Sequence, residues 1–364
     1  MKKYILMLSL LAVAFDTVAQ ENRKPEYIKF KNGAVLTFDK ANIEKSDVIF
    51  GEGGAQDSLG IKIYMKDGSC RDYLYSQIFF VAFEEQGGGQ TDDKNMNRNG
   101  EYELGRNREA WRLEFPRLHH GDEDFTYEIT HYADADSVVN FSLEWDGEKL
   151  GNRWTCYELY EANLAKNVKR KDNFREDPKI TNPAHRTTLA QYSATSSTYS
   201  RGHLCPSGDR LASRQQNGQT FYLSNMQPQA TGHNSGVWSQ LEGKVRAYAT
   251  AADCDTLYIV KAATIDKAED ISEVTAAGLH VPKYFYMALL SYDKAKDEYH
   301  ALGIWSPHYK GSTTEYITIR ELEERTGIDF FCNLPDETEN AVEADSSDDN
   351  ARYWGITFSS TQQP

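Results

Sequence analysis

A glycine-rich polar stretch divides the chain into two parts that must each build a core of their own. Residues 86–90 read Gln-Gly-Gly-Gly-Gln, and polar residues continue from there to Gly100. Such a stretch has almost nothing to bury and is typical of a linker. The chain has 364 residues, which is enough for two domains of ordinary size. We therefore predict a small domain over residues 22–85, a linker over residues 86–105 and a larger domain over residues 106–335.

The segment before the linker has the pattern of a small β-rich domain. Residues 27–30 and 34–38 flank Asn32-Gly33, which is a strong hairpin signal. A second pair of strands is expected at residues 61–65 and 71–83. The segment shows no cluster of histidine, cysteine or carboxylate residues at ligand spacing, so its role stays open among binding of cell wall, carbohydrate or a partner, and shielding of another site.

The part after the linker mixes strands and helices without the regular alternation that a parallel sheet requires. An apolar stripe of Trp238, Leu241 and Val245 predicts a helix over residues 234–248. The mixture predicts an α+β domain. Strand patterns occur at residues 125–132, 138–145, 220–223, 256–260, 285–291 and 299–305.

A second helix is predicted over residues 319–325. Thr318 and Glu321 have the spacing of a capping box, and Gly327 stands where a C-terminal cap would end the helix. The chain after residue 335 is expected to be an acidic tail over residues 336–364. Residues 336–349 contain seven acidic residues and no basic one, so this run is expected to be solvated and mobile, or else to exclude anionic ligands from the wrong face.

Residues 1–19 have the features of a secretory signal peptide. Lys2 and Lys3 precede a twelve-residue, largely apolar stretch, and small residues ending at Ala19 supply a cleavage site. We therefore expect a secreted or periplasmic protein, cleaved near Ala19. No internal run reaches the roughly 18 apolar residues of a membrane span. The oligomeric state stays open.

Export would permit disulfide bonds, but the sequence does not assign any. The five cysteines form no CxxC pair and have no metal-type spacing, so zinc is not supported. Two possibilities stay equally open: one or two disulfide bridges, or five buried free thiols. The cysteines are Cys70, Cys156, Cys205, Cys254 and Cys332.

Residues 199–210 carry the most informative motif of the chain. Arg201-Gly202-His203 is followed by proline, serine and glycine, so this histidine is not expected in a plain helix. The predicted strand at residues 220–223 runs into polar amides that include Asn225. The predicted helix after it begins at Asn234 and carries Glu242 and Arg246 four residues apart, where their side chains can meet.

This set of residues resembles the DNA/RNA non-specific endonucleases, the ββα-metal nucleases that include secreted bacterial sugar-nonspecific nucleases and mitochondrial endonuclease G. Their Asp-Arg-Gly-His signature is followed thirty-odd residues later by an Asn-x-x-x-Trp-x-x-x-Glu helix, as here at Asn234, Trp238 and Glu242. The resemblance covers roughly residues 110–335. It implies a central, mostly antiparallel sheet flanked by helices, preceded here by the small β-rich domain.

The resemblance also implies roles for individual residues. His203 is implied as the general base, and Asn234 as the direct ligand of Mg²⁺, with Mn²⁺ or another divalent ion as alternatives. Glu242 would contact the ion through water, because eight residues span about 12 Å of helix. Arg201 and Arg246 would stabilise phosphate charge, since guanidinium groups match phosphate oxygens. Asn225 is assigned a supporting role.

The sequence departs from the family pattern beside the signature. Ser200 occupies the position of the family aspartate; because serine can still hydrogen-bond locally, we expect the geometry to survive and the rate to suffer. His233 stands where an apolar residue is common, and we interpret it as a bystander. The upstream phosphate-binding cation stays open among Lys169, Arg170 and Lys171, with Arg175 close behind them.

The chain is acidic as a whole, but the charge around the motif is compatible with binding of nucleic acid. The formal net charge is −15, or −16 without residues 1–19, and phosphate backbones repel carboxylates. Residues 166–214, however, hold ten lysines and arginines against four acids. A focused basic groove can bind phosphate on an acidic protein.

These observations favour an exported, metal-dependent endonuclease that cleaves DNA and RNA without sequence specificity. Phosphate contacts carry no sequence information, as such an enzyme requires. Two alternatives stay open. One is a catalytically silent, nuclease-like module that binds anions or a partner protein, which the serine at position 200 allows. The other is a related metal phosphodiesterase that acts on smaller substrates.

Overall fold

The computed structural model describes the chain as two compact units, residues 1–92 and 93–364. The first unit contains two small antiparallel sheets, in strand order β1-β7-β2-β3 and β4-β5-β6. The residues described are 5–6, 25–30, 35–38, 42–50, 58–74, 78–83, 95, 97–119, 121, 124–133, 138–309, 311 and 313–359. The strands of the first unit are β1 (Ile5–Leu6), β2 (Pro25–Phe30), β3 (Val35–Thr37), β4 (Ile43–Phe50), β5 (Ser58–Met65), β6 (Cys70–Leu74) and β7 (Ile78–Phe83).

The first unit contains the first predicted hairpin, whereas the strand predicted over residues 71–83 is divided into β6 and β7, which belong to different sheets. Strands β2 and β3 pair on either side of the Asn-Gly turn, and β5 pairs with β6. The turn itself lies outside the described residues. Strand β4, which was not predicted, completes the second sheet, and Ile28, Ile43 and Ile63 are buried together as the core of the unit. The fold of this unit is therefore β-rich, as expected.

Part of the predicted signal peptide forms an edge strand. Ile5–Leu6 pair with β7 at the end of the first sheet, while the rest of residues 1–24 lies outside the described residues. Because β1 is a two-residue edge strand, its removal would leave β7, β2 and β3 paired. Within the described residues, no helix has the length and apolar character needed to cross a bilayer.

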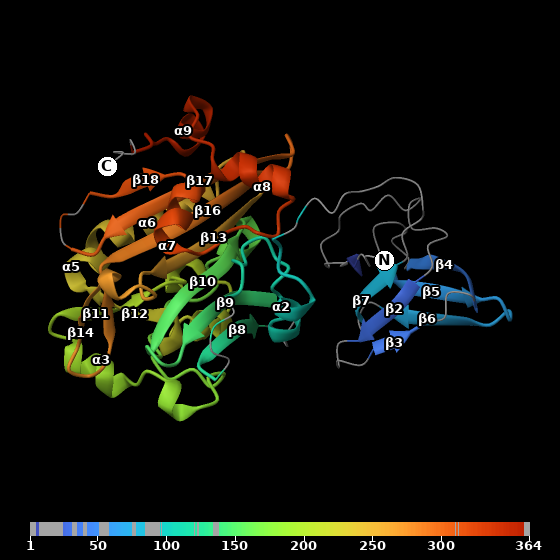
Figure 1. Ribbon diagram of the computed structural model, residues 1–364, viewed down its shortest axis with the longest axis horizontal. Helices are drawn as coiled ribbons and strands as arrows, with labels where there is room; N and C mark the ends of the chain where they lie inside the picture. Colours follow the sequence, from blue (N-terminus) through green and yellow to red (C-terminus); the bar gives the residue numbers. More distant parts are fainter. Residues whose placement is uncertain are drawn as a thin grey trace. The chain divides into compact units, whose positions relative to one another are not determined.

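The second unit is organised around an antiparallel sheet of seven strands in the order β18-β17-β16-β13-β10-β9-β8 (Figure 1). The α+β class and the mostly antiparallel central sheet are thus confirmed. Most strands predicted for this sheet are present, but β10 and β18 were missed. The strands are β8 (Thr126–Ala133), β9 (Val138–Asp146), β10 (Gly151–Leu159), β13 (Thr256–Ala263), β16 (Tyr284–Asp293), β17 (Glu298–Pro307) and β18 (Glu315–Ile317).

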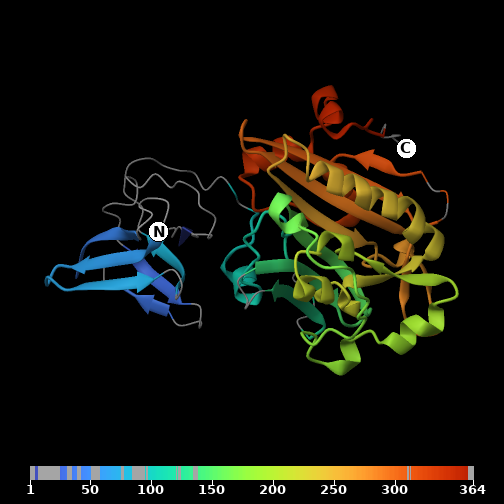
Figure 2. The same ribbon diagram turned by 180° about the vertical axis from the view of Figure 1, so that it is seen from behind.

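Both faces of the large sheet are buried, and each is covered by helices. On β16, Phe285, Met287 and Leu289 enter one core and the residues between them enter the other, as the two-residue period of a strand requires. Helix α6 covers the first face and helix α7 covers the second (Figures 1 and 2). The described α-helices of this unit are α2 (Glu101–Arg106), α3 (Leu189–Thr195), α4 (Arg214–Gln219), α5 (Thr231–His233), α6 (Ser239–Tyr248), α7 (Ile319–Thr326), α8 (Asp336–Glu343) and α9 (Asp348–Trp354).

The caps predicted for the second helix are present in α7. The Thr318 side chain accepts a hydrogen bond from the Glu321 backbone N–H at 3.1 Å. Gly327 has a φ of 75°, a left-handed conformation that favours glycine and ends the helix. These local signals were sufficient to predict both ends of α7, because they do not depend on any distant part of the chain.

The segment after residue 335 is not the solvated tail that its charge predicted. It folds into α8 and α9, and Trp354 at the end of α9 is 1% exposed in the core beside α6. Two of the acidic residues, Glu339 and Glu343, are themselves buried. The prediction was wrong because it counted charges and gave no weight to the helical placement of a few apolar residues.

The predicted linker also ends earlier than its composition suggested. Asn95 donates to the backbone oxygen of Cys332 at 2.9 Å, and Asn99 donates to the backbone oxygens of Ala110 and Pro116 at 3.0 Å. The second unit thus begins before the α2 helix. Asparagine side chains anchor this segment through hydrogen bonds, which a search for apolar residues does not detect.

The apolar run at residues 220–223 is buried but does not form the predicted strand. It leads into a short 3₁₀ helix at Leu223–Asn225, and the strand begins only at β12 (Met226–Ala230). Strand β12 pairs with β11 (Tyr199–His203), and a second small ribbon joins β14 (Ile271–Val274) to β15 (His280–Pro282). All five cysteines are free thiols, and three of them are buried.

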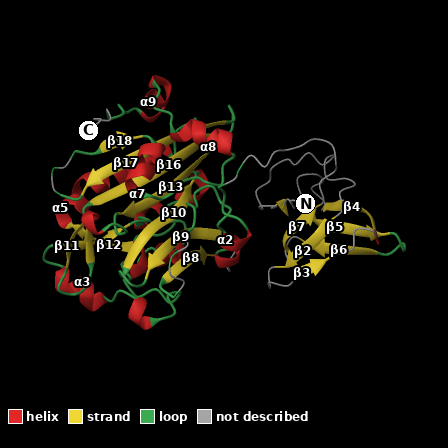
Figure 3. Cartoon of the chain, in the orientation of Figure 1, coloured by secondary structure: helices red, strands yellow, loops and turns green. Residues whose placement is uncertain are grey.

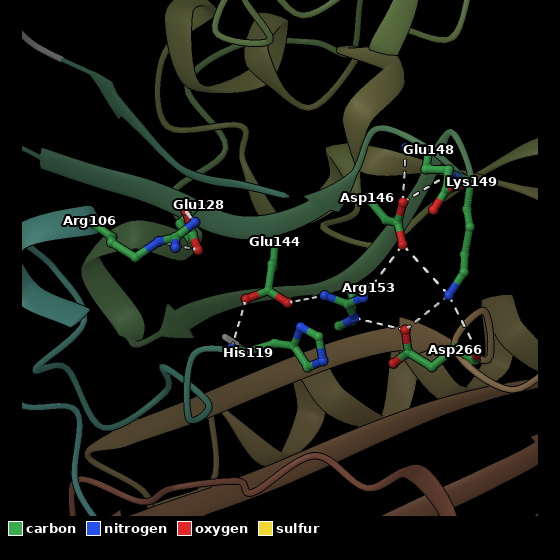
Figure 4. Close-up of polar contacts among 9 residues, drawn as sticks. All are labelled: Arg106, His119, Glu128, Glu144, Asp146, Glu148, Lys149, Arg153 and Asp266. Atoms are coloured by element: carbon green, nitrogen blue, oxygen red, sulfur yellow. Dashed lines mark hydrogen bonds and ion pairs between the residues drawn. The ribbon is translucent and has the colours of Figure 1, made fainter. Parts of the chain in front are cut away.

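A buried ion-pair network joins β9, β10 and the segment that follows β13 (Figure 4). The Arg153 guanidinium lies 2.6 Å from Glu144, 2.8 Å from Asp266 and 3.5 Å from Asp146. The His119 backbone N–H donates to the second oxygen of Glu144 at 3.2 Å. Burial raises the pKa of Glu144 to about 7. Because Arg153 directs its donors to three carboxylates, the network fixes these neighbouring segments to one another.

Candidate active site

The motif residues meet where a two-stranded ribbon runs into a helix. Strands β11 and β12 pair antiparallel, and the chain continues through α5 and a π-helical turn, Asn234–Trp238, into α6 (Figure 3). His203 is the last residue of β11, and Asn234 is the first residue of the π-helical turn. This β-β-α order places the two residues in one continuous structural unit, although they are thirty-one positions apart in the sequence.

The glycine of the motif is required by the closeness of the two strands. A Cβ atom on Gly202 would overlap the side chain of Gln229 on β12. Beside it, the Ser200 hydroxyl lies 3.0 Å from the Thr231 hydroxyl and hydrogen-bonds to it. The serine in place of the family aspartate therefore makes a local hydrogen bond of the kind expected from the sequence.

His203 lies in an aromatic enclosure that favours the neutral imidazole. The ring packs edge-to-face on Phe221 with centroids 5.1 Å apart, and Phe174 lies 5.9 Å away. Burial and the nearby positive charge of Arg170 lower the pKa of His203 to about 3. Its Nε2 has no hydrogen-bond partner within the described residues. A neutral ring with a free nitrogen can accept a proton.

Asn225 holds the chain immediately after His203. Its side-chain oxygen accepts from the Cys205 N–H at 2.8 Å, and its amide donates to the oxygens of Cys205 and Thr220, both at 2.9 Å. Asn225 is fully buried, so these bonds are shielded from water. These contacts position the loop that follows His203, and none of them is to His203 itself.

Asn234 and Glu242 provide oxygen atoms without protein partners. In the part of the chain that the structure describes, neither side chain makes a hydrogen bond. Burial raises the pKa of Glu242 to about 7, although Lys261 and Arg246 act in the opposite direction. Lys261 projects from β13, is 0% exposed and has no hydrogen-bond partner among the described residues. Glu242 therefore lies among charged side chains, and Asn234 is partly buried at the start of the π-helical turn.

Arg246 is paired with a residue that the sequence analysis did not single out. Its guanidinium lies 2.7 Å from Asp209, and not in an ion pair with Glu242 as the helical spacing suggested. Asp209 is fully buried and accepts a second hydrogen bond from the Tyr157 hydroxyl at 3.0 Å. These contacts fix the direction of the Arg246 side chain and hold its pKa above the ordinary value.

The four upstream cations are not equivalent. Arg170 lies over the Phe221 ring at 5.2 Å, on the aromatic side chain that packs against His203. Lys169 and Lys171 are exposed, and within the described residues only their backbone atoms make hydrogen bonds. Arg175 instead donates to the backbone oxygens of Asn173 and Gly218, at 2.9 and 2.8 Å, and lies over Tyr222. Arg170 is thus the cation of this group nearest to the histidine.

Arg201 and His233 have different surroundings. The Arg201 guanidinium lies 3.9 Å from the centre of the Phe174 ring, which holds it beside the same enclosure as His203. His233 is buried, with its two ring nitrogens 2.8 Å from Gln229 and 2.9 Å from Ser306. With both nitrogens occupied, His233 anchors the end of α5, directly before Asn234, and is not a free base of the site.

The donor set fits a hard divalent cation. The unpartnered oxygens of Asn234 and Glu242 are an amide and a carboxylate, which are the ligand types that Mg²⁺ prefers. No cysteine thiol is paired with them, so a soft metal is not favoured. Mg²⁺ usually keeps several waters and takes further oxygens from substrate phosphate, so a small protein ligand set is sufficient.

Two residues of the site were missed at the sequence level, and each had a recognisable signal. Asp209 lies six residues after His203, inside the motif segment that the analysis had already identified. Lys261 interrupts the apolar strand pattern of Leu257, Ile259 and Ala263, which all enter the core beside α6. A charge on the buried face of a strand marks a position with a specific partner or role.

Residues 123–337 match the sequence pattern of the DNA/RNA non-specific endonucleases. A nuclease of Nostoc sp. is 27% identical over 215 residues, covering 56% of this chain and 75% of the relative. Nuclease C1 of Cunninghamella echinulata is 32% identical over 174 residues, covering 44% and 67%. The mitochondrial nuclease EXOG of Xenopus laevis is 26% identical over 230 residues, covering 58% and 62%. Because the family pattern spans more than half of the chain and includes the whole ribbon-helix site, the protein belongs to the DNA/RNA non-specific endonuclease family.

Proposed function

We propose that this protein is an exported, divalent-metal-dependent endonuclease that hydrolyses phosphodiester bonds of DNA and RNA without sequence specificity. The observation that carries the proposal is the state of His203. Its ring is enclosed by Phe174 and Phe221, is neutral at physiological pH and keeps one nitrogen free. An unprotonated imidazole can act as a general base toward a water molecule, although a pKa as low as about 3 makes it a weak one.

The charged residues around His203 suit a phosphate substrate. Arg201 and Arg170 lie beside the aromatic enclosure, and Arg246 is held in place by Asp209. Guanidinium groups bind phosphate oxygens in a fixed geometry and stabilise the negative charge of the transition state. A divalent ion held by Asn234, with Glu242 nearby, would supply Lewis-acid stabilisation of the same charge. Each of these contacts would be to the backbone of a nucleic acid, which explains the absence of sequence preference.

The proposal is tested by incubating the purified chain with plasmid DNA and with RNA. Both substrates are expected to be degraded in Mg²⁺ or Mn²⁺, and EDTA is expected to stop the reaction. Binding of nucleic acid without cleavage in any divalent ion would favour the catalytically silent module. Cleavage of bis-nitrophenyl phosphate without cleavage of polynucleotides would favour the smaller-substrate phosphodiesterase.

Export is proposed from residues 1–19 alone. If this segment is a signal peptide, the mature protein will begin at or next to Gln20, and the chain will be found in the periplasm or the medium. Mass spectrometry of the natural protein's N-terminus tests this. A mature chain that keeps Lys2 and Lys3 would contradict it.

Asn234→Ala is expected to raise the Mg²⁺ concentration needed for half-maximal cleavage by at least about tenfold, because it removes the proposed direct ligand. A titration of cleavage rate against Mg²⁺ concentration measures the effect. Asn234→Asp is the matched control, since it keeps a side-chain oxygen at the same place and should recover most of the affinity. An unchanged Mg²⁺ requirement in the alanine variant would show that the ion is held elsewhere.

Asp209→Asn is expected to lower kcat/KM about tenfold, because a neutral amide holds Arg246 less firmly than a carboxylate does. Steady-state cleavage of a short DNA substrate measures this change in kcat/KM. If Asp209 acts by positioning Arg246, adding Arg246→Ala to Asp209→Asn should cost less than Arg246→Ala does alone. Additive losses from the two changes would assign Asp209 a role that is independent of Arg246.

A further inference from the structure

A buried lysine lies behind the candidate active site without a hydrogen-bond partner. Lys261 projects from β13, the middle strand of the seven-stranded sheet, and is 0% exposed. Within the described residues its ammonium nitrogen makes no hydrogen bond. An ammonium group buried in this way costs free energy, because it gives up its water without a direct replacement. Its neighbours on the same face of β13, Ile259 and Ala263, are apolar, so packing alone does not require a lysine here.

The strand register places Lys261 on the face of the sheet that α6 covers. Lys261 pairs with Met287 of β16, and Met287 belongs to the core that also contains Leu241 of α6. Residues directly opposite each other on neighbouring strands point to the same face of a sheet. The lysine side chain therefore extends from the sheet on the side of α6, the helix that carries Glu242.

Tyr157 connects Lys261 to the other charged residues of the site. The lysine ammonium nitrogen lies 5.7 Å from the centre of the Tyr157 ring, within range of a cation–π contact. The Tyr157 hydroxyl donates to one oxygen of Asp209 at 3.0 Å, and Arg246 donates to the other oxygen at 2.7 Å. Both oxygens of Asp209 are thus occupied, and this carboxylate is committed to Arg246.

Glu242 is the carboxylate that remains for Lys261. In the described part of the chain its side chain makes no hydrogen bond and no ion pair within 4 Å. Of the charged side chains that act on Glu242, Lys261 has the strongest electrostatic effect, ahead of Asp209 and Arg246. The attraction acts without direct contact, because charges are screened less in a protein interior than in water. The four charges therefore form two pairs, Asp209 with Arg246 and Glu242 with Lys261.

We propose that Lys261 is a positioning residue whose buried positive charge holds the Glu242 carboxylate in place at the active site. The inference rests on the proposed function, in which Glu242 lies beside the divalent ion. A carboxylate without hydrogen bonds can adopt several rotamers, and a charge fixed on a rigid element favours one of them. Strand β13 is rigid in this sense, since it has a neighbouring strand on both sides. The cost of burying Lys261 is thus offset by the orientation that it gives to Glu242.

Thermal unfolding of the chelator-treated full chain, without substrate, tests the pairing. Glu242→Gln is expected to lower the Tm of the parent, because it leaves the buried ammonium group without its carboxylate. In a Lys261→Met background the same change should lower the Tm by at least about 2 °C less. Circular dichroism follows unfolding of the parent, the two single variants and the double variant. Equal shifts in the two backgrounds would overturn the proposal, whether or not the protein is a nuclease.

Steady-state kinetics test the consequence for the reaction. Lys261→Met should lower kcat for DNA cleavage at least about tenfold and leave KM within about threefold, because Glu242 is misplaced while the phosphate-binding arginines are unchanged. Adding Lys261→Met to Glu242→Gln should lower kcat by less than about twofold further. An unchanged kcat in Lys261→Met, or a full additional loss in the double variant, would also overturn the proposal.

Control variants separate these effects from general damage to the fold. Lys294→Met changes an exposed lysine in the turn between β16 and β17, and it should keep the Tm and kcat of the parent. Lys261→Gln removes the charge but keeps hydrogen-bond donors, and it replaces Lys261→Met in both tests if methionine prevents folding. A parent chain that cleaves no nucleic acid, with Tm shifts that still depend on Lys261, would support the pairing and refute the proposed function.

Discussion

Replacing His203 by alanine is expected to lower the rate of plasmid cleavage at saturating Mg²⁺ by about 10²–10⁴-fold, the range typical for loss of a general base. The structure gives the physical reason. The ring is the neutral, unpartnered nitrogen base of the site, enclosed by Phe174 and Phe221 and close to Arg170. Initial rates on supercoiled plasmid measure the effect directly.

DNA binding should survive the same substitution. The arginines that suit phosphate, Arg170, Arg201 and Arg246, stay in place, so a gel-shift experiment with Ca²⁺ or without metal should show nearly unchanged affinity. His300→Ala is a matched control, because His300 lies on β17 and stacks on Tyr353 with centroids 3.8 Å apart. Its cleavage rate should stay within about twofold of the parent. Cleavage that persists in His203→Ala would refute the assigned base.

A measurement of stability gives a second readout that does not depend on activity. In the unfolded chain a histidine has a pKa near 6.5, whereas the fold lowers the pKa of His203 to about 3. The folded protein therefore binds fewer protons than the unfolded chain between these values, and stability is lost as the pH falls from 6.5 toward 3. His203→Ala removes this group, so the variant should lose less stability than the parent over that pH window.

Trp354→Ala is expected to destabilise the second unit by about 3–5 kcal/mol, the usual range for deleting a large buried aromatic side chain. Trp354 ends α9, is 1% exposed and packs edge-to-face on Tyr248 of α6, with centroids 4.9 Å apart. The backbone oxygen of the same residue accepts a hydrogen bond from the Tyr248 hydroxyl at 2.9 Å. Urea or thermal unfolding, followed by far-ultraviolet circular dichroism and not by tryptophan fluorescence, measures the change in the free energy of unfolding.

This prediction distinguishes a docked C-terminal segment from a solvated one. Tyr309→Ala, at a tyrosine that is 60% exposed, is the control and should change the unfolding free energy by less than about 0.5 kcal/mol. A chain ending at residue 335 should be at least as unstable as Trp354→Ala. An alanine variant as stable as the parent would restore the interpretation of residues 336–364 as an acidic tail.

Patterns with a short range were predictable from the sequence. The strands predicted at residues 285–291 and 299–305 correspond to β16 and β17, because both are strongly apolar and each has a neighbouring strand on both sides. The start and end of α7 followed from Thr318 and Gly327. Strand β10 was missed because its nine residues mix buried polar and apolar side chains, among them Asn152 and Arg153, whose partners lie in distant segments of the chain.

The candidate site was predictable where spacing alone defines it. Asn234, Trp238 and Glu242 recur at four-residue steps, a spacing that is visible in the sequence, although the structure divides them between a π-helical turn and α6 and buries Trp238 in the core. The partner of Arg246 was not predictable in this way. Asp209 reaches it only because the loop after β11 folds back on β10 and α6.

The sequence by itself determined the family motif, the α+β class and the residue types that can accept a proton, bind an ion and hold phosphate. It did so because those properties depend on residue identity and on distances along one strand or one helix. Only the tertiary structure decided which cation lies nearest to His203, that Asp209 orients Arg246, and that the acidic C-terminal residues are folded against α7 and the sheet. Burial and electrostatic pairing arise between segments that are distant in the chain, so net charge and composition cannot specify them.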